Sequence, residues 1–157
     1  MDDDVAIQLR RAISKLARQL NSSSTGAGLT PSQASVLGLI VARGPLGIGE
    51  LGEREGLNPT MLSRVVGKLY SMSLIDRIRD PADLRSVSVV STPAGRTLDK
   101  RIKAQKAAAV SRCMALLSAE QAAAVTAALP ALEELAEIMR SELPAHRRMR
   151  ATRGQIA

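Results

Sequence analysis

Aromatic residues and cysteines are nearly absent from this chain of 157 residues. It has one tyrosine, Tyr70, no phenylalanine and no tryptophan. Its single cysteine, Cys113, cannot form an intrachain disulfide, which suits a reducing cytoplasm. The one histidine, His146, stands in a basic tail, so the sequence offers neither a zinc site nor a nucleophile–base pair. We therefore expect no metal, no cofactor and no enzymatic activity.

Long apolar runs are also missing, and the acidic start at Asp2 is the reverse of a secretory signal, so we expect a cytoplasmic protein without a membrane partner. Charge is abundant, and the net charge is +7. Residues 96–112 hold six basic side chains against one acidic, and residues 140–157 hold five against one. Basic blocks suit a polyanion, whose phosphates provide affinity through counterion release. For the tail alone, a solvated disordered segment is the simpler interpretation.

Two short helices are predicted between Gly49 and Leu69. The first ends at a turn at Gly56, and Asn58-Pro59 begins the second, because Asn caps free amides and Pro lacks an amide donor. One stripe of the second helix is apolar and consists of Leu62, Val65, Val66 and Leu69. The opposite face holds no acid and consists of Thr60, Met61, Ser63, Arg64, Gly67 and Lys68. Such a helix is suited to the major groove of DNA.

A basic hairpin follows these helices. Residues 74–79 alternate like a strand, residues 87–90 are its expected partner, and the Asp- and Pro-containing segment between them is a turn. A tip that ends in Arg85 suits the minor groove, where negative potential is concentrated, and Asp83 can orient that guanidinium. Arg77 can brace the hairpin or contact phosphate. Taken alone, the segment is equally typical of a surface hairpin with solvated charges.

The outer segments are predicted to be helices that build a dimer. Apolar stripes mark a helix before Asn21 and another after Pro93, and capping boxes begin helices at Thr30 and Ser118. Pro130 is expected to kink or split the last helix. Because these helices are alanine-rich and lack aromatics, we expect a second copy to cover their apolar faces. The alternative is a monomer that packs them internally.

Residues 50–64 resemble the helix-turn-helix of the multiple-antibiotic-resistance regulator (MarR) family. Residues 74–77 resemble the start of that family's wing, and residues 80–86 with 91–95 are similar to its wing-to-helix signature. The resemblance covers nearly the whole chain except the last dozen residues. It implies a mainly α fold, with a winged helix-turn-helix core and a two-stranded β wing flanked by N- and C-terminal dimerisation helices. It also implies a homodimeric transcriptional regulator that releases DNA when a small molecule binds.

On this basis we predict four segments. They are an N-terminal dimerisation helix and linker (1–29), a winged DNA-binding lobe (30–91), C-terminal dimerisation helices (92–143) and a flexible basic tail (144–157). Base-edge contacts are assigned to Thr60, Met61, Ser63 and Arg64, a phosphate contact to Lys68, and wing contacts to Arg77, Asp83 and Arg85. Two such helices about 34 Å apart would enter successive major grooves, so the expected partner is a palindromic operator in double-stranded DNA.

Regulation leaves several interpretations open. The resemblance places an effector pocket between the dimer helices and the winged core, and without Phe or Trp we expect an aliphatic, methionine-lined pocket. This suits a bulky apolar effector and equally permits none. Cys113 lies on an apolar stripe, so a buried thiol is expected; an exposed one would instead suggest a redox-responsive regulator. A helical adaptor without specific DNA binding is the other alternative, against which the acid-free helix face argues.

Overall fold

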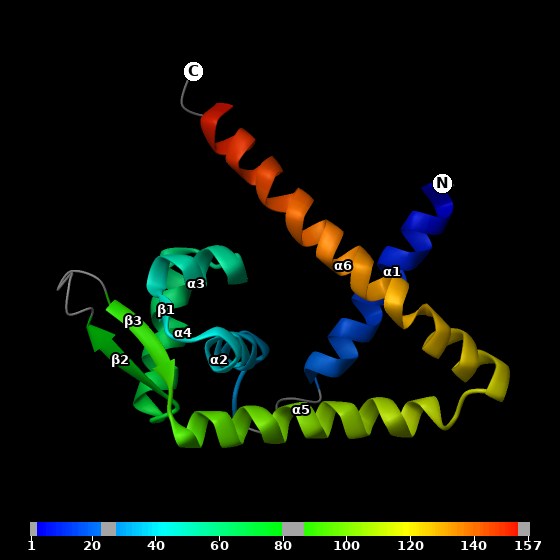
Figure 1. Ribbon diagram of the computed structural model, residues 1–157, viewed down its shortest axis with the longest axis horizontal. Coiled ribbons are helices and arrows are strands. Elements are labelled where there is room, and N and C mark those ends of the chain that lie inside the picture. The colour runs from blue at the N-terminus through cyan, green and yellow to red at the C-terminus, as the bar shows by residue number, and fades with distance from the viewer. Residues whose placement is uncertain (1–2, 23–27, 80–86, 154–157) are drawn as a thin grey trace. The chain divides into compact units, whose positions relative to one another are not determined.

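The computed structural model of the chain describes residues 3–22, 28–79 and 87–153, with side chains up to residue 142. These residues form a mainly helical structure with a small antiparallel sheet (Figure 1). The elements are α1 (Asp3–Ser22), α2 (Pro31–Arg43), β1 (Leu46–Gly47), α3 (Ile48–Glu55), α4 (Pro59–Ser71), β2 (Ile75–Arg79), β3 (Val87–Ser91), α5 (Pro93–Met114) and α6 (Ala119–Arg153). They belong to two units, residues 1–110 and residues 111–157.

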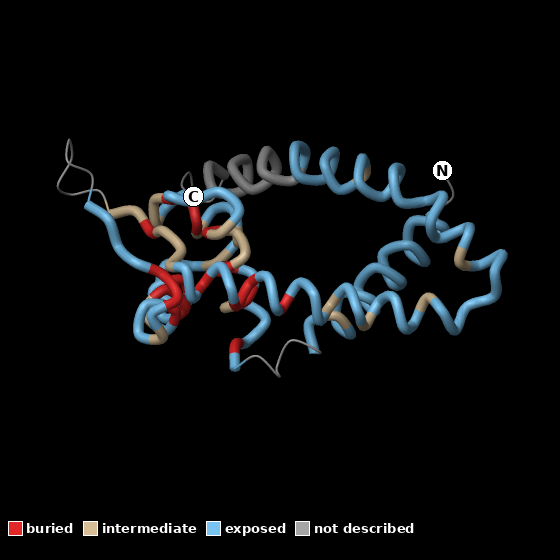
Figure 2. Tube along the Cα trace, turned by 60° about the horizontal axis from the view of Figure 1, so that its bottom comes forward, coloured by how far each residue is buried: buried red, intermediate tan, exposed pale blue. Residues whose placement is uncertain are grey.

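The core of the first unit lies where α2, α3, α4 and the sheet meet. α2 begins at the predicted capping box: Thr30 Oγ1 accepts from the Gln33 amide at 3.3 Å, and Gln33 Oε1 accepts from the Thr30 amide at 2.9 Å. Three almost completely buried side chains follow in this helix: Val36, Leu37 and Ile40. In Figure 2 the buried positions gather in these elements and in the first turns of α5.

The sheet has the strand order β1-β3-β2, and both pairs are antiparallel. The predicted wing hairpin is present as β2 and β3, with Ile75 opposite Ser91 and Arg79 opposite Val87. The sequence did not predict β1, which pairs Leu46 with Val89 and makes the sheet three-stranded. Both of these side chains are buried, so β1 contributes to the core although two residues are too few to show a strand period.

α1 and most of α5 lie outside this core. α1 has no buried residue, so most of its predicted apolar stripe is exposed in the single chain. α5 buries residues only near its start, the last of them being Ile102. Cys113, close to the end of α5, is exposed, and the expectation of a buried thiol is therefore wrong for the single chain. The physical reason is that α5 extends well beyond the core against which its first turns pack.

The second unit contains α6. The predicted capping box is present, since Ser118 Oγ accepts from the Gln121 amide at 3.2 Å and Gln121 Oε1 accepts from the Ser118 amide at 3.1 Å. α6 continues through Pro130 without interruption, so Pro130 does not split it. Its neighbours include many alanines and leucines, which are strong helix formers and offset one missing amide donor. α6 also continues past residue 143, where we expected the dimerisation helices to end.

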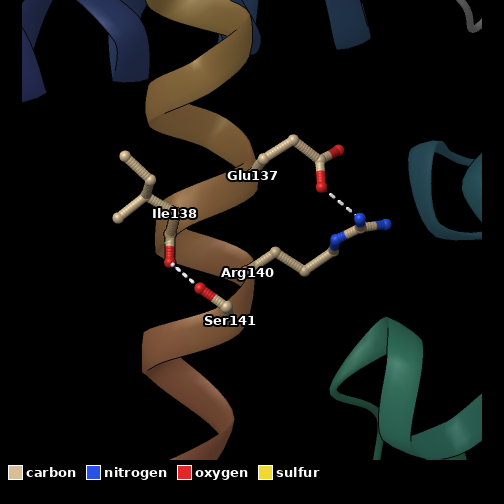
Figure 3. A network of polar contacts seen from close by, with 4 residues as sticks. All are labelled: Glu137, Ile138, Arg140 and Ser141. Atoms are coloured by element: carbon tan, nitrogen blue, oxygen red, sulfur yellow. Dashed lines mark hydrogen bonds and ion pairs between the residues drawn. The ribbon is translucent and has the colours of Figure 1, made fainter.

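Polar contacts within α6 are local. The Arg140 guanidinium pairs with the Glu137 carboxylate, and the Ser141 hydroxyl donates to the Ile138 carbonyl at 2.8 Å (Figure 3). These contacts span one turn each, so they stabilise the helix itself, and apolar side chains such as Leu129 and Met139 stay exposed. Within residues 3–22, 28–79 and 87–153, no helix combines the length and apolar content that a membrane crossing needs.

Candidate DNA-binding interface

The second helix of the predicted pair is α4, and its start is set by Asn58. The backbone of Asn58 is extended, with φ −71° and ψ 158°, and its Oδ1 accepts from the Met61 amide at 2.9 Å. Pro59 occupies the first helical turn, where a missing amide donor costs nothing. The four residues of the predicted apolar stripe are all buried: Leu62, Val65, Val66 and Leu69. Their burial determines the rotation of α4 about its axis.

This rotation leaves the opposite face of α4 in solvent. The five predicted contact residues are all exposed on it: Thr60, Met61, Ser63, Arg64 and Lys68. Neither Arg64 nor Lys68 forms an ion pair with any side chain that the structure describes. Both cations are therefore available to an anionic partner. We refer to this exposed side of α4 as the reading face.

The junction of α3 with α4 needs two glycines, one in the turn and one inside α3, for different reasons. Gly56 has φ 64°, in the left-handed region, and ends α3 by donating its amide to the Gly52 carbonyl. Gly52 lies at the contact between the two helices, where an added Cβ would stand 3.1 Å from Leu62 Cδ2. The two helices consequently pack closely and hold the reading face in a fixed orientation relative to the lobe.

The wing is braced against α4 by a cation–π contact that the sequence reasoning did not identify. Ile75 and Arg77 share one face of β2; Ile75 is fully buried, whereas Arg77 is exposed. The Arg77 guanidinium carbon is 5.2 Å from the centroid of the Tyr70 ring, within the range of a cation–π interaction. The only hint in the sequence was that Tyr70 is the sole aromatic residue and directly follows the predicted helix that ends at Leu69. Asp83 and Arg85 lie outside the described residues.

α5 begins at a tight junction with the turn that follows α4. Ser73 has φ 57°, and its carbonyl accepts from the Thr92 hydroxyl at 2.8 Å. The Thr92 amide donates to the Leu74 carbonyl at 3.1 Å, and the Thr92 hydroxyl accepts from the Gly95 amide at 3.0 Å. A Cβ on Gly95 would stand 2.0 Å from the Leu74 carbonyl oxygen. The start of α5 is thus bonded to the turn that joins α4 to β2 of the wing.

Comparison with known proteins identifies this arrangement. Residues 29–87 match the model of the MarR family. An uncharacterised HTH-type transcriptional regulator of Mycobacterium leprae (strain TN) is 33% identical over 118 residues, which cover 74% of this chain and 82% of that protein. The chain belongs to the MarR family. It is a transcriptional regulator with a DNA-binding winged helix-turn-helix.

Two further proteins extend the likeness of this MarR-family chain. The HTH-type transcriptional repressor MdtR of Bacillus subtilis (strain 168) is 27% identical over 137 residues, covering 85% of this chain and 88% of MdtR. The structure of a mutant MepR of S. aureus bound to an oligodeoxyribonucleotide has a TM-score of 0.62 at 17% identity, covering 83% of this chain and 96% of that one. At that identity the second likeness concerns the fold.

The MarR-family lobe also has a groove of about 420 Å³ beside α5, lined by residues of α1, α2 and α5 and by the end of α3. Its lining combines charged, polar and aliphatic side chains, and no methionine takes part, so the methionine-lined part of the expectation does not hold for this groove. The Asp99 carboxylate is buried there, 2.7 Å from Lys103 Nζ, and Lys106 Nζ donates to Asn21 Oδ1 at 3.3 Å. The apolar part of the lining includes Ile102 and Leu57.

Proposed function

We propose that this protein is a homodimeric repressor in the cytoplasm that binds palindromic operators in double-stranded DNA and releases them when a small molecule binds. The observation that carries the proposal is the reading face of α4, which is exposed, acid-free and cationic on a helix whose other face is fully buried. A helix of this width fits the major groove of B-DNA. The repressor name of MdtR and the oligonucleotide bound to MepR support it.

The proposed contacts follow from position along α4. Residues near the start of a recognition helix reach base edges, so we assign Thr60, Met61, Ser63 and Arg64 to them. Arg64 is suited to a bidentate guanine contact and Met61 to a thymine methyl group. Lys68 lies farther along and is assigned to phosphate, where it adds affinity without sequence preference.

The wing is proposed to reach the adjacent minor groove. Arg85 at its tip is the assigned probe, with Asp83 orienting it. Arg77 is assigned a phosphate contact that depends on the Tyr70 ring, because the stacked guanidinium remains exposed and can still donate outward. The stack explains how one residue can both brace the wing and touch DNA.

The uncovered apolar faces support the dimer. Leu16 of α1 is 64% exposed, and Leu129 and Met139 of α6 are each about half exposed. A soluble chain gains roughly 25 cal/mol for each Å² of such surface removed from water, which favours a second copy over solvent. We therefore assign residues 1–29 and 92–143 to dimerisation. Leu16→Glu should produce monomers by light scattering while the winged lobe stays folded.

The groove beside α5 is the proposed effector site. Its Asp99, Lys103 and Lys106 lie next to Ile102 and Leu57, so a ligand with one polar group and an apolar body fits its chemistry. A ligand there would contact α5, whose start is bonded through Thr92 to the turn between α4 and β2. A shift of α5 would then change the separation of the two reading faces, which must match fixed grooves.

The proposal is tested by selecting bound sequences from random duplex DNA, with and without a panel of aromatic acids and lipophilic drugs. We expect a palindrome. Arg64→Glu should abolish its binding in a gel-shift assay yet leave dimerisation unchanged. Arg43→Glu is the matched control: Arg43 is exposed on the same lobe but belongs to α2, so the same charge reversal there should weaken binding far less. Equal losses in both variants, or no palindrome, would contradict the proposal and favour an adaptor role.

A further inference from the structure

Five glycines lie inside helices of the described chain, and three of them have a packing reason. A Cβ on Gly38 would stand 3.2 Å from Asp99 Oδ1, one on Gly52 would stand 3.1 Å from a Leu62 methyl, and one on Gly95 would stand 2.0 Å from the Leu74 carbonyl. At these three positions the packed fold leaves too little room for a side chain. Gly67 of α4 and Gly49 of α3 have no heavy atom within 4 Å of an added Cβ.

Backbone conformation does not explain Gly67 either. The glycines with positive φ are Gly28 and Gly56, so Gly67 has the ordinary helical conformation that alanine would adopt more readily. Glycine is the weakest helix former apart from proline, and Gly67 lies in the interior of α4, where that penalty applies fully. Gly49 lies in the first turn of α3. Folding alone would thus favour a side chain at position 67.

The position of Gly67 on α4 suggests what the missing side chain permits. It follows Ser63 by four residues and Arg64 by three, so on a helix it lies on the reading face beside both. The four buried positions of α4 are on the opposite side. Gly67 is therefore the position on the reading face where no side chain stands over the helix backbone.

We propose that Gly67 is a close-approach position, where the backbone of α4 comes into contact with the DNA and a side chain would hold the helix away. This inference rests on the proposed DNA contact of the reading face and assigns it a further residue. A methyl group at position 67 would separate α4 from the duplex and lengthen the neighbouring contacts of Ser63 and Arg64. The same methyl group would stabilise the free protein, so folding and binding respond in opposite directions.

The test compares Gly67→Ala and Gly67→Leu with the wild type. Both residues favour helix, so the melting temperature should rise by roughly 2–4 °C for alanine. Affinity for the selected operator should fall about tenfold for alanine, as expected when well-packed contacts are forced apart, and further for leucine because it is larger. Stability and DNA binding would be measured on the same full-length preparations.

Gly49→Ala is the matched control, since it places the same methyl group in equally open space on the neighbouring helix. It should leave operator binding unchanged. The inference is overturned if Gly67→Ala binds the operator as tightly as the wild type, or if Gly49→Ala loses as much affinity. These results would leave the proposed function intact as long as the wild type binds a palindrome and Arg64→Glu does not. A wild type that binds no palindrome would overturn both.

Discussion

Replacing Gly95 by alanine should loosen the junction between α5 and the turn that follows α4. The added Cβ would stand 2.0 Å from the Leu74 carbonyl oxygen and 3.3 Å from Leu37 Cδ1. Restoring even a 3.0 Å separation requires a shift of about 1 Å, and the neighbour that must move is backbone, not the flexible end of a side chain. Such a shift would stretch two hydrogen bonds that Thr92 makes, one to the Leu74 carbonyl at 3.1 Å and one to the Ser73 carbonyl at 2.8 Å.

The size of the effect follows from these contacts. Overpacking of a filled site costs about 1–3 kcal/mol, and each weakened hydrogen bond adds up to about 1 kcal/mol. We take about 3 kcal/mol as the total, which lowers the melting temperature of a protein of this size by about 6–12 °C. Thermal unfolding followed by circular dichroism, at one fixed protein concentration because a dimer's stability depends on it, measures this shift.

Gly49→Ala again provides the comparison, because no atom lies within 4 Å of its added methyl group. It should melt at or slightly above the wild-type temperature. If Gly95→Ala melts at the same temperature as the wild type, the close approach of α5 to Leu74 does not constrain the fold. The proposed transmission of an α5 shift to the reading face then loses its support.

Three further outcomes are expected. Asn58→Ala should lose the cap of α4 and about 1 kcal/mol of stability in urea unfolding, whereas Asn58→Ser should retain most of it. Tyr70→Leu should remove the cation–π contact with Arg77 and weaken operator binding in gel shifts, at a cost of only about 0.5–1 kcal/mol of stability. Tyr70→Phe should bind the operator like the wild type. Equal binding by the wild type and both variants would exclude a role for the ring. Lys68→Ala should lower the slope of log affinity against log salt concentration by about the share of one phosphate contact. An unchanged slope would exclude that contact.

The parts of the fold that local chemistry determines could be predicted from the sequence. The caps at Thr30, Asn58 and Ser118 were confirmed because each depends on side chains within three residues of the helix start. The buried stripe of α4 was confirmed because its spacing is regular and its opposite face is polar. The same regularity placed all five reading-face residues in solvent.

Features that depend on distant partners could not be predicted. β1 is stabilised by Val89, more than forty residues away, and its two residues have no period to detect. The exposure of Cys113 depends on where the core ends along α5, and the spacing of apolar residues in α5 does not predict that point. The contact between Arg77 and Tyr70 joins a strand to a helix, and the groove beside α5 combines residues of four segments. Of the two outcomes expected at Pro130, a kink or a split, the split does not occur, because the helix-forming residues around Pro130 outweigh that single local signal.

The solitary ring of Tyr70 has a practical consequence for spectroscopy. Because the chain has no phenylalanine or tryptophan and only one histidine, the aromatic region of its proton NMR spectrum is nearly empty. The Tyr70 signals should therefore be assignable without isotopic labelling. Since the ring lies under the Arg77 guanidinium at the base of the wing, its chemical shifts would monitor that joint directly in titrations with operator or candidate ligands.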